Sequence, residues 1–367
     1  MLGAVQLGLF AAGVVLFVPM GMAGWHLSRN KMLFFSCALF ITLAVGVHLV
    51  PYFPSVTSFL SSPGSSVPSS FIVNRDSCLS LLHQVAFDFQ ELDNNNNDTS
   101  SDSKRGSWKW VESGTVVDCG FQKLTKTDAS DLLNGSWVVV AGDSQARLMV
   151  VSLLELLLGT NEMEMVKGDL FQRHSDYNIF VDEIGMKLDF MWAPYVSNLT
   201  DLMPVFKEKK SYPDVFVMGA GLWDMLHVNN ASDYGVSLKS LKDSVVLLLP
   251  VSLAFANDDG SGTNVGPVRS PSLFWLGMPK LINSMLNTDE KREKMTDVMW
   301  QAYSDELYRS KLLQQFGGPL FLLDIHSLSN NCGAHCTGDG MHYHVAVYEA
   351  AVHIMLNGLL IESNQKL

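Results

Sequence analysis

Short apolar runs that alternate with helix-like segments constrain the fold of this chain most. From Ser136 onward there are four such runs, each bounded by turn residues. A strand that is buried on both faces reads as a continuous apolar run, and parallel strands need a crossover between them. The alternation therefore predicts an α/β domain of three layers with a parallel sheet. The expected strands are Trp137–Ala141, Asp214–Met218, Leu273–Leu276 and Leu320–Asp324.

Helical periodicity fills the segments between and after these strands. The third helix has candidate caps in Asn287 and Thr288 and a stop signal at Gly317. The stretch Tyr177–Trp192 alternates around Gly185 and predicts a local hairpin inserted into the domain. The expected helices are Gln145–Leu158, Ser237–Leu249, Asp289–Phe316 and His344–Ile361.

The beginning of the chain carries two long apolar runs, residues 2–25 and 32–50. Each run is long enough to cross a hydrocarbon core of about 30 Å. Arg29 and Lys31 lie between the runs and favour the cytoplasmic side, which places the rest of the chain in the lumen. We therefore expect residues 1–50 to form a membrane anchor of one or two transmembrane helices. The alternative is a pair of buried core helices.

Composition divides the rest of the chain. Residues 51–115 are expected to be a lumenal stalk and linker, because residues 55–70 are rich in Ser and Pro and residues 92–105 are polar and low in complexity. Residues 116–367 are expected to form the folded domain. The chain has 25 basic and 37 acidic residues and a net charge of −12. This balance argues against a nucleic-acid partner, because such binding depends on clustered Lys and Arg.

Sequons and cysteines agree with a lumenal position. The sequons predict N-glycosylation at Asn97, Asn134, Asn198 and Asn230. Cys37 lies inside the second apolar run, so the lumenal cysteines are Cys78, Cys119, Cys332 and Cys336. In an oxidising compartment we expect two disulfides and favour the pairs Cys78–Cys119 and Cys332–Cys336. The alternative is a metal site that uses Cys332, His335, Cys336 and His342.

Ser144 follows Gly142 and Asp143 at the end of the first expected strand. A serine at the start of a helix lies near free backbone amides and near the positive end of the helix dipole. Those amides could stabilise the oxyanion that forms when a serine attacks a carbonyl. The other reading is that Asp143 or Ser144 only caps the helix.

The segment between the last strand and the last helix favours the catalytic reading. It contains Asp339 and, three residues later, His342. A serine hydroxyl needs a base to take its proton, and the imidazole needs a carboxylate on its other nitrogen. Both loops leave the same edge of the sheet, so we expect a Ser144–His342–Asp339 triad. His326 is a second candidate for the base.

Two motifs resemble those of the SGNH, or GDSL-like, esterase superfamily. They are Gly142-Asp143-Ser144-x-x-Arg147 and Asp339-Gly-Met-His342. Within the superfamily the chain is similar to the PC-esterase branch, which includes the plant Trichome Birefringence-Like polysaccharide acetyltransferases and the sialic-acid O-acetyltransferases. The resemblance covers roughly Ser136 to the end of the chain. It implies an SGNH-hydrolase-like fold and a catalytic domain within residues 116–367.

The same resemblance implies a function and its partners. It implies O-acetyl transfer to plant cell-wall polysaccharides such as xyloglucan and xylan, with acetylesterase activity beside it. The expected place is the Golgi membrane, with the catalytic domain in the lumen. An acetyl donor is required, either acetyl-CoA or an acetylated intermediate, and no tightly bound cofactor or metal is expected. Other membrane proteins of acetylation are further candidate partners.

The chain departs from the family pattern in the third motif, Val217 to Met225. Gly219 stands where the family commonly has an oxyanion-hole asparagine, whereas Gly221 and Trp223 match it. The loss of one oxyanion donor can slow catalysis roughly a hundredfold or more. The glycine of the second motif is not identifiable, with Gly168 and Gly185 as candidates. The expected oxyanion or substrate-binding set is Gly142, Asp143, Arg147, Gly219, Gly221 and Trp223.

Arg147 has three readings at this stage: it pairs with an acid, it meets the acetyl donor, or it lies on the surface of its helix. The function also has alternatives. One is a weakly active component that relays acetyl groups to other transferases. The other is a membrane-tethered glycoprotein that has the fold without the chemistry.

Overall fold

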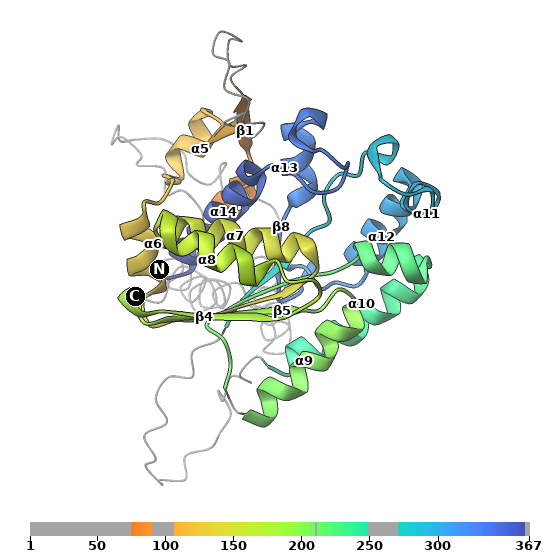
Figure 1. The fold of residues 1–367 in the computed structure, drawn as a ribbon, viewed down its shortest axis with the longest axis horizontal. Helices are drawn as coiled ribbons and strands as arrows, with labels where there is room; N and C mark the ends of the chain where they lie inside the picture. Colours follow the sequence, from red (N-terminus) through yellow and green to blue (C-terminus); the bar gives the residue numbers. More distant parts are fainter. Residues whose placement is uncertain (1–74, 90–105, 210, 249–270, 364–367) are drawn as a thin grey trace, which may run out of the picture. The chain divides into compact units, whose positions relative to one another are not determined.

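A six-stranded sheet is the framework of the computed structural model, which describes residues 75–89, 106–209, 211–248 and 271–363 (Figure 1). The strand order is β4-β5-β3-β6-β7-β8. The strands from β5 to β8 are parallel, and only the edge strand β4 runs antiparallel to its neighbour. Their bounds are β3 Trp137–Gly142, β4 Tyr177–Val181, β5 Met186–Trp192, β6 Val215–Gly219, β7 Ser272–Leu276 and β8 Phe321–Leu323.

The central strands are apolar on both faces because each face is covered. In β3, Val138 and Val140 belong to the core on one side of the sheet, and Val139 and Ala141 belong to the core on the other side. All four are essentially inaccessible to solvent. This is the pattern that a parallel sheet between two helical layers imposes, and it confirms the predicted α/β class.

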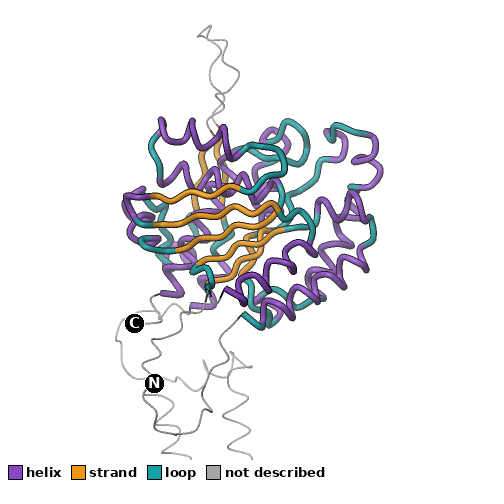
Figure 2. Tube along the Cα trace, turned by 60° about the horizontal axis from the view of Figure 1, so that its bottom comes forward, coloured by secondary structure: helices purple, strands orange, loops and turns teal. Residues whose placement is uncertain are grey.

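Helices cover both faces of the sheet, as Figures 1 and 2 show. One core contains apolar side chains of α6 Lys126–Leu133, α7 Ser144–Leu157, α8 Thr160–Leu170 and α14 Val345–Ser363. The other core contains those of α9 Val196–Lys209, α10 Ala231–Val246 and α12 Asp297–Arg309. Two shorter helices, α11 Asp289–Lys294 and α13 Ile325–Cys332, follow β7 and β8.

The folded unit begins earlier than the predicted boundary between residues 115 and 116. It includes α4 Arg75–Leu81, a hairpin of β1 Val85–Phe89 and β2 Gly106–Trp110, and α5 Gly114–Asp118. Leu82 and Trp108 are buried in the core with α7 and α14. The disulfide Cys78–Cys119 joins α4 to the end of α5. Burial of these apolar side chains makes residues 75–89 and 106–118 part of the domain instead of a linker.

Three predicted elements differ from the structure. The helix predicted over Ser237–Leu249 is α10 and begins at Ala231, because Asn230 caps it there. The stretch Tyr177–Trp192 is a hairpin, but β5 pairs with β3 and belongs to the main sheet, so it is no local insertion. The helix predicted over Asp289–Phe316 is interrupted. Thr296 caps α12 by accepting the backbone amide of Met299, and Met295 has non-helical backbone angles. The side chain of Thr296 can cap and so start a new helix. It therefore divides a segment whose helical periodicity is continuous in the sequence.

The predicted membrane anchor, the Ser- and Pro-rich stretch and Asn97 lie outside the described residues. Among the described residues, α14 alone is long and apolar enough to cross a membrane. Its most apolar 18 residues are 67% buried inside the structure. Its packing against α7 and the sheet accounts for that apolar composition.

Candidate active site

The carboxyl ends of β5, β3 and β6 form the edge of the sheet that carries the site. Gly142 at the end of β3 is in register with Trp192 of β5 on one side and with Gly219 of β6 on the other. A Cβ atom at Gly142 would lie 2.5 Å from the carbonyl oxygen of Gly219, so this close approach requires glycine. The residues that follow, Asp143 and Ser144, therefore lie at the edge where ligands bind to such sheets.

The cap of α7 is Asp143. Its side chain accepts a hydrogen bond from the backbone amide of Gln145 at 2.9 Å. Ser144 is the first residue of the helix, and its hydroxyl is not used as the cap. Instead, Ser144 Oγ lies 2.7 Å from Nε2 of His342.

His342 lies between this hydroxyl and a carboxylate. Its Nδ1 is 2.6 Å from Oδ2 of Asp339. The other carboxylate oxygen of Asp339 accepts the backbone amides of Met341 and His342 at 3.0 and 2.8 Å. Burial alone would raise the pKa of Asp339, but the hydrogen bonds from His342 and Met341 outweigh burial and lower it. An ionised Asp339 favours a proton on Nδ1, which leaves Nε2 of His342 free to accept the proton of Ser144.

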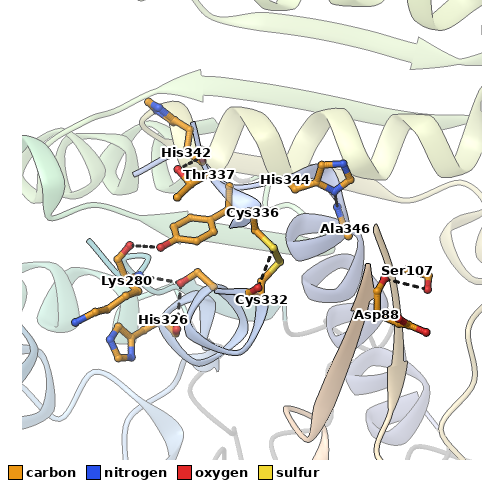
Figure 3. Close-up of a disulfide and its surroundings, with 12 residues drawn as sticks. Asp88, Ser107, Lys280, His326, Cys332, Cys336, Thr337, His342, His344 and Ala346 are labelled. Atoms are coloured by element: carbon orange, nitrogen blue, oxygen red, sulfur yellow. Dashed lines mark hydrogen bonds between the residues drawn. A yellow bond between two sulfur atoms is a disulfide. The ribbon is translucent and has the colours of Figure 1, made fainter. Parts of the chain in front are cut away.

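The histidine loop, Thr337–His344, holds this geometry through its own polar groups. Thr337 donates its hydroxyl to the carbonyl of His342 at 2.8 Å (Figure 3). The same hydroxyl accepts the backbone amide of Gly340 at 3.0 Å. Gly340 has a φ of 77°, and a Cβ there would lie 2.5 Å from the carbonyl oxygen of Ile282. The loop thus needs glycine at this turn.

A disulfide closes the base of the histidine loop. Cys332 at the end of α13 is bonded to Cys336, with 5.9 Å between their Cα atoms (Figure 3). The backbone amide of His344 donates to the carbonyl of Cys336 at 2.7 Å, so both ends of the loop meet at the disulfide. Both sulfurs are bonded to each other, and His342 is engaged by Ser144 and Asp339. The alternative metal site from Cys332, His335, Cys336 and His342 is therefore wrong.

Gln145 joins the nucleophile helix to the histidine loop. It is 4% exposed. Its Nε2 donates to the carbonyl of Met341 at 3.0 Å, and its Oε1 accepts the hydroxyl of Tyr348 from α14. A buried amide with both ends bonded fixes the relative position of the elements that it joins. No sequence pattern marks Gln145 for this role, because its partners are about two hundred residues away in the chain.

Arg147 is buried one turn after Ser144. Its side chain is among the buried charged groups, with 7% exposure. The guanidinium lies over the rings of Phe190 and Trp192, at 5.3 and 5.0 Å from their centroids. Its Nε and Nη2 have no hydrogen-bond partner, and burial lowers its pKa. Arg147 is therefore no surface residue, and it pairs with no acid among the residues that the structure describes. Both of these readings are wrong.

Aromatic side chains gather around Trp223 at the same edge of the sheet. We call this group the aromatic cluster; it consists of His174, Trp192, Tyr195, Trp223 and His227. Ring centroids of the other four lie between 5.2 and 5.9 Å from that of Trp223. The Trp and Tyr side chains are half-buried, and the two histidines are exposed. Of these five residues, only Trp223 was expected at the site. Assignment of β5 to the main sheet would have placed Trp192 and Tyr195 there.

Packing explains Gly219, the last residue of β6, and Gly221 in the loop that follows. A Cβ at Gly219 would lie 2.8 Å from Cβ of Leu276, and one at Gly221 would lie 2.6 Å from the sulfur of Met278. An asparagine therefore does not fit this backbone at position 219. Position 219 therefore offers no side-chain oxyanion donor.

Two carboxyl groups are buried near the site. Burial raises the pKa of Asp143 to about 6, against the lowering effects of the Gln145 amide and of His342. Burial likewise raises the pKa of Asp224 to about 6. The carboxylate of Asp224 accepts the backbone amide of Val196 at 3.4 Å. It thereby links the π-helix η3 Asp224–Val228 to the first residue of α9.

The other candidates lie elsewhere. His326 on α13 stacks on Trp300 with ring centroids 4.0 Å apart, whereas the imidazole at Ser144 is that of His342. Gly168 lies inside α8. Gly185 lies in the β4–β5 turn at the opposite edge of the sheet, next to the segment that leads into β3. Neither glycine supplies the donor of the second motif.

The sequons within the described residues differ in accessibility. Asn134 is exposed at the end of α6. Asn230 is exposed, but it caps α10 and its Nδ2 donates to Asp233 at 2.9 Å. Asn198 is half-buried in α9, and its side chain accepts the amide of Tyr195. Asn134 is therefore the sequon that a glycan reaches with the least rearrangement.

The arrangement of Ser144, His342 and Asp339 is suited to acyl transfer. A hydroxyl within hydrogen-bond reach of an imidazole that a carboxylate orients can attack a carbonyl and form an ester. The amides in the first turn of α7 lie beside this hydroxyl and can stabilise an oxyanion.

Comparison with known proteins identifies a relative over the full length of this chain. No family model matches it. It is 58% identical over 375 residues to Protein ALTERED XYLOGLUCAN 9 of Arabidopsis thaliana, and the match covers 100% of both chains. Among solved structures it is similar to TesA, at 15% identity and a TM-score of 0.33, over 61% of this chain and 97% of that one. It is also similar to a catalytic mutant of Axe2, an acetylxylan esterase from Geobacillus stearothermophilus, at 13% identity and a TM-score of 0.35, over 65% and 96%.

Proposed function

The chain belongs to the family of Protein ALTERED XYLOGLUCAN 9, and we propose that it transfers acetyl groups to hydroxyls of xyloglucan or a related plant cell-wall polysaccharide. The observation that carries this proposal is the contact series from Ser144 Oγ through His342 to Asp339, at 2.7 and 2.6 Å. The name of the relative supports the choice of polysaccharide.

In the first step, Ser144 Oγ attacks the acetyl carbonyl of the donor while Nε2 of His342 takes the hydroxyl proton. The tetrahedral oxyanion is stabilised by backbone amides of the first turn of α7 and of the loop after β6. When the intermediate collapses, the leaving group takes the proton from His342, and the acetyl group remains on Ser144 as an ester. Asp339 stays ionised and stabilises the imidazolium in between.

In the second step, a sugar hydroxyl attacks the acetyl-serine and gives its proton to Nε2 of His342. Collapse of this intermediate returns the proton to Ser144 Oγ and releases the acetylated sugar. Water can take the place of the sugar hydroxyl, so acetylesterase activity accompanies transfer. The donor is acetyl-CoA or an acetylated intermediate made by another protein.

We further propose that the domain works in the lumen of the Golgi, anchored by the apolar runs at residues 2–25 and 32–50. Two disulfides support an oxidising compartment. N-glycosylation at Asn134 is the matching expectation, and a mobility shift on a gel after glycan removal would detect it. A domain that sealed vesicles leave open to protease would contradict this location.

The test of the catalytic proposal is hydrolysis of an activated acetyl ester by the purified chain. Ser144→Ala and His342→Ala should each lower kcat by about a thousandfold or more, and the double variant should be little worse than either single one. Because Asp143 caps α7, Ser144→Ala should leave the melting temperature nearly unchanged. If Ser144→Ala keeps wild-type hydrolysis, Ser144 is not the nucleophile.

A further inference from the structure

We propose that the aromatic cluster is the binding site for a sugar ring of the acceptor polysaccharide. The inference rests on the proposed function, because it assigns the second substrate of the same site. No residue of the cluster is needed for the contacts that join Ser144, His342 and Asp339. The triad contacts therefore do not account for the presence of the cluster.

The cluster lies beside the nucleophile. Trp192 is the last residue of β5 and is in register with Gly142 of β3. Gly142 precedes Ser144 by two residues. The guanidinium of Arg147, one turn into α7, lies over the same Trp192 ring. Neighbouring strands are about 4.8 Å apart. A ligand on the cluster therefore lies at the same edge of the sheet as the hydroxyl that carries the acetyl group.

Unusual backbone segments build the cluster. His174 adopts a φ of 56°, which is uncommon for a residue with a side chain, and its ring stacks on Trp192 at 4.8 Å. Trp223 directly precedes the π-helix η3 and His227 lies within it; this rare element is frequent at functional sites. A cluster that only filled space would not require either conformation.

Polar contacts of the backbone hold these segments together. The backbone amide of Trp192 donates to the carboxylate of Asp176 at 2.7 Å, which ties the segment with His174 to the end of β5. Buried Asp224 ties η3 to Val196, the residue after Tyr195. Arg147 supports Trp192 from the core side. The rings are thus positioned before a ligand arrives, which lowers the entropic cost of binding.

The chemistry of the cluster fits a neutral sugar. The faces of aromatic rings are negative and attract the C–H bonds of a pyranose ring, and Trp and Tyr also offer hydrogen-bonding groups at their edges. A nucleotide base can stack as well, but its phosphates need cations. Among the described residues, Arg147 is the cation with a cation–π contact to a ring of the cluster, and it is buried behind Trp192; the chain carries a net charge of −12. These features favour the acceptor over a phosphorylated donor.

Calorimetric titration with a xyloglucan oligosaccharide that lacks acetyl groups tests the inference. Trp223→Ala in the full chain should raise the Kd of the oligosaccharide about tenfold or more. His174→Ala should raise it severalfold, and because its side chain is exposed it serves if Trp223→Ala unfolds. Phe316→Ala is the matched control, because this ring is 44% exposed in another aromatic pair and lies outside the cluster. Its Kd should equal that of the wild type.

Binding needs no chemistry, so the outcome is separate from that of ester hydrolysis. If Trp223→Ala and His174→Ala are folded and bind the oligosaccharide like the wild type, the inference is wrong. It is also wrong if these variants lose affinity for acetyl-CoA while their affinity for the oligosaccharide is unchanged. Absence of hydrolysis by the wild-type chain, with the expected change in Kd, would overturn the catalytic proposal and leave this one standing.

Discussion

The histidine loop contacts Ser144, whereas the aromatic cluster lies at the same edge of the sheet, and the two are held in different ways. The histidine loop is fixed by directional contacts: a disulfide at its base, the hydroxyl of Thr337, and both oxygens of Asp339. The aromatic cluster is held mainly by ring contacts, with carboxylates tying its backbone segments together. The directional contacts hold His342, the proton acceptor, in one position. The ring contacts instead form a surface on which a ligand can lie.

Mutations in the histidine loop and mutations in the aromatic cluster should therefore affect different kinetic or binding constants. A change in the histidine loop or its supports should lower kcat, because proton transfer needs heavy-atom distances near those observed. A change in the aromatic cluster should act on acceptor affinity, as the titration above measures.

Gln145→Ala should have the largest effect among these supports. It removes the link from α7 to the histidine loop and leaves the carbonyl of Met341 and the hydroxyl of Tyr348 without their partner. We expect kcat for ester hydrolysis to fall roughly ten- to a hundredfold with little change in KM, and stability to fall by about 1–3 kcal/mol. Gln301→Ala, at an exposed position of α12, is the matched control. Equal effects on KM and kcat would contradict a positioning role.

The two disulfides should separate activity from stability. The double variant Cys332→Ser with Cys336→Ser frees the base of the histidine loop and should lower kcat severalfold. Cys78→Ser with Cys119→Ser frees α4 from the end of α5, outside the histidine loop, and should mainly lower stability, by about 2–4 kcal/mol. Rates and melting curves of both double variants check this. The comparison fails if the Cys78 and Cys119 variant loses more activity than the other one.

The smallest expected effect is that of Asp143→Asn on the pH dependence of the free energy of unfolding. The pKa of Asp143 is raised to about 6 by burial, so the folded state holds this proton more tightly than the unfolded state. Its stabilising contribution is therefore complete below the ordinary carboxyl pKa and is lost as pH rises through about 6. Through Asp143, the free energy of unfolding of the wild type should fall by roughly 2 kcal/mol between pH 4 and pH 6. Asp143→Asn keeps a side-chain cap for the Gln145 amide and should abolish this fall. Denaturant titrations at both pH values measure it; an unchanged pH dependence would exclude Asp143 as its source.

The sequence predicted the parts of the molecule that depend on local spacing. The strand Trp137–Ala141 and the turn into α7 follow from an apolar run that ends at glycine. Asp339 and His342 are three residues apart, so their contact is set within one loop. The favoured cysteine pairs and the disulfides of the structure also agree.

The parts that the sequence did not predict depend on distant contacts. Arg147 lies on a helix face that the sequence alone does not orient, and only β5 shows that Trp192 and Phe190 cover it. The alternation of Tyr177–Trp192 fits an isolated hairpin as well as a pair of sheet strands, so β5 was assigned outside the sheet. Most of the aromatic cluster was missed with it. The break before Thr296 was missed because a capping threonine can also sit inside a helix.

Trapping of the acyl-enzyme tests the central claim most directly. The full chain is mixed with an activated acetyl ester, quenched in acid within the first turnover, digested and analysed by mass spectrometry. The account predicts one acetyl group on the peptide with Ser144, which is absent in Ser144→Ala and does not accumulate in His342→Ala. Rapid hydrolysis of the ester with Ser144 unmodified at every time point, or the acetyl group on another residue, would contradict it.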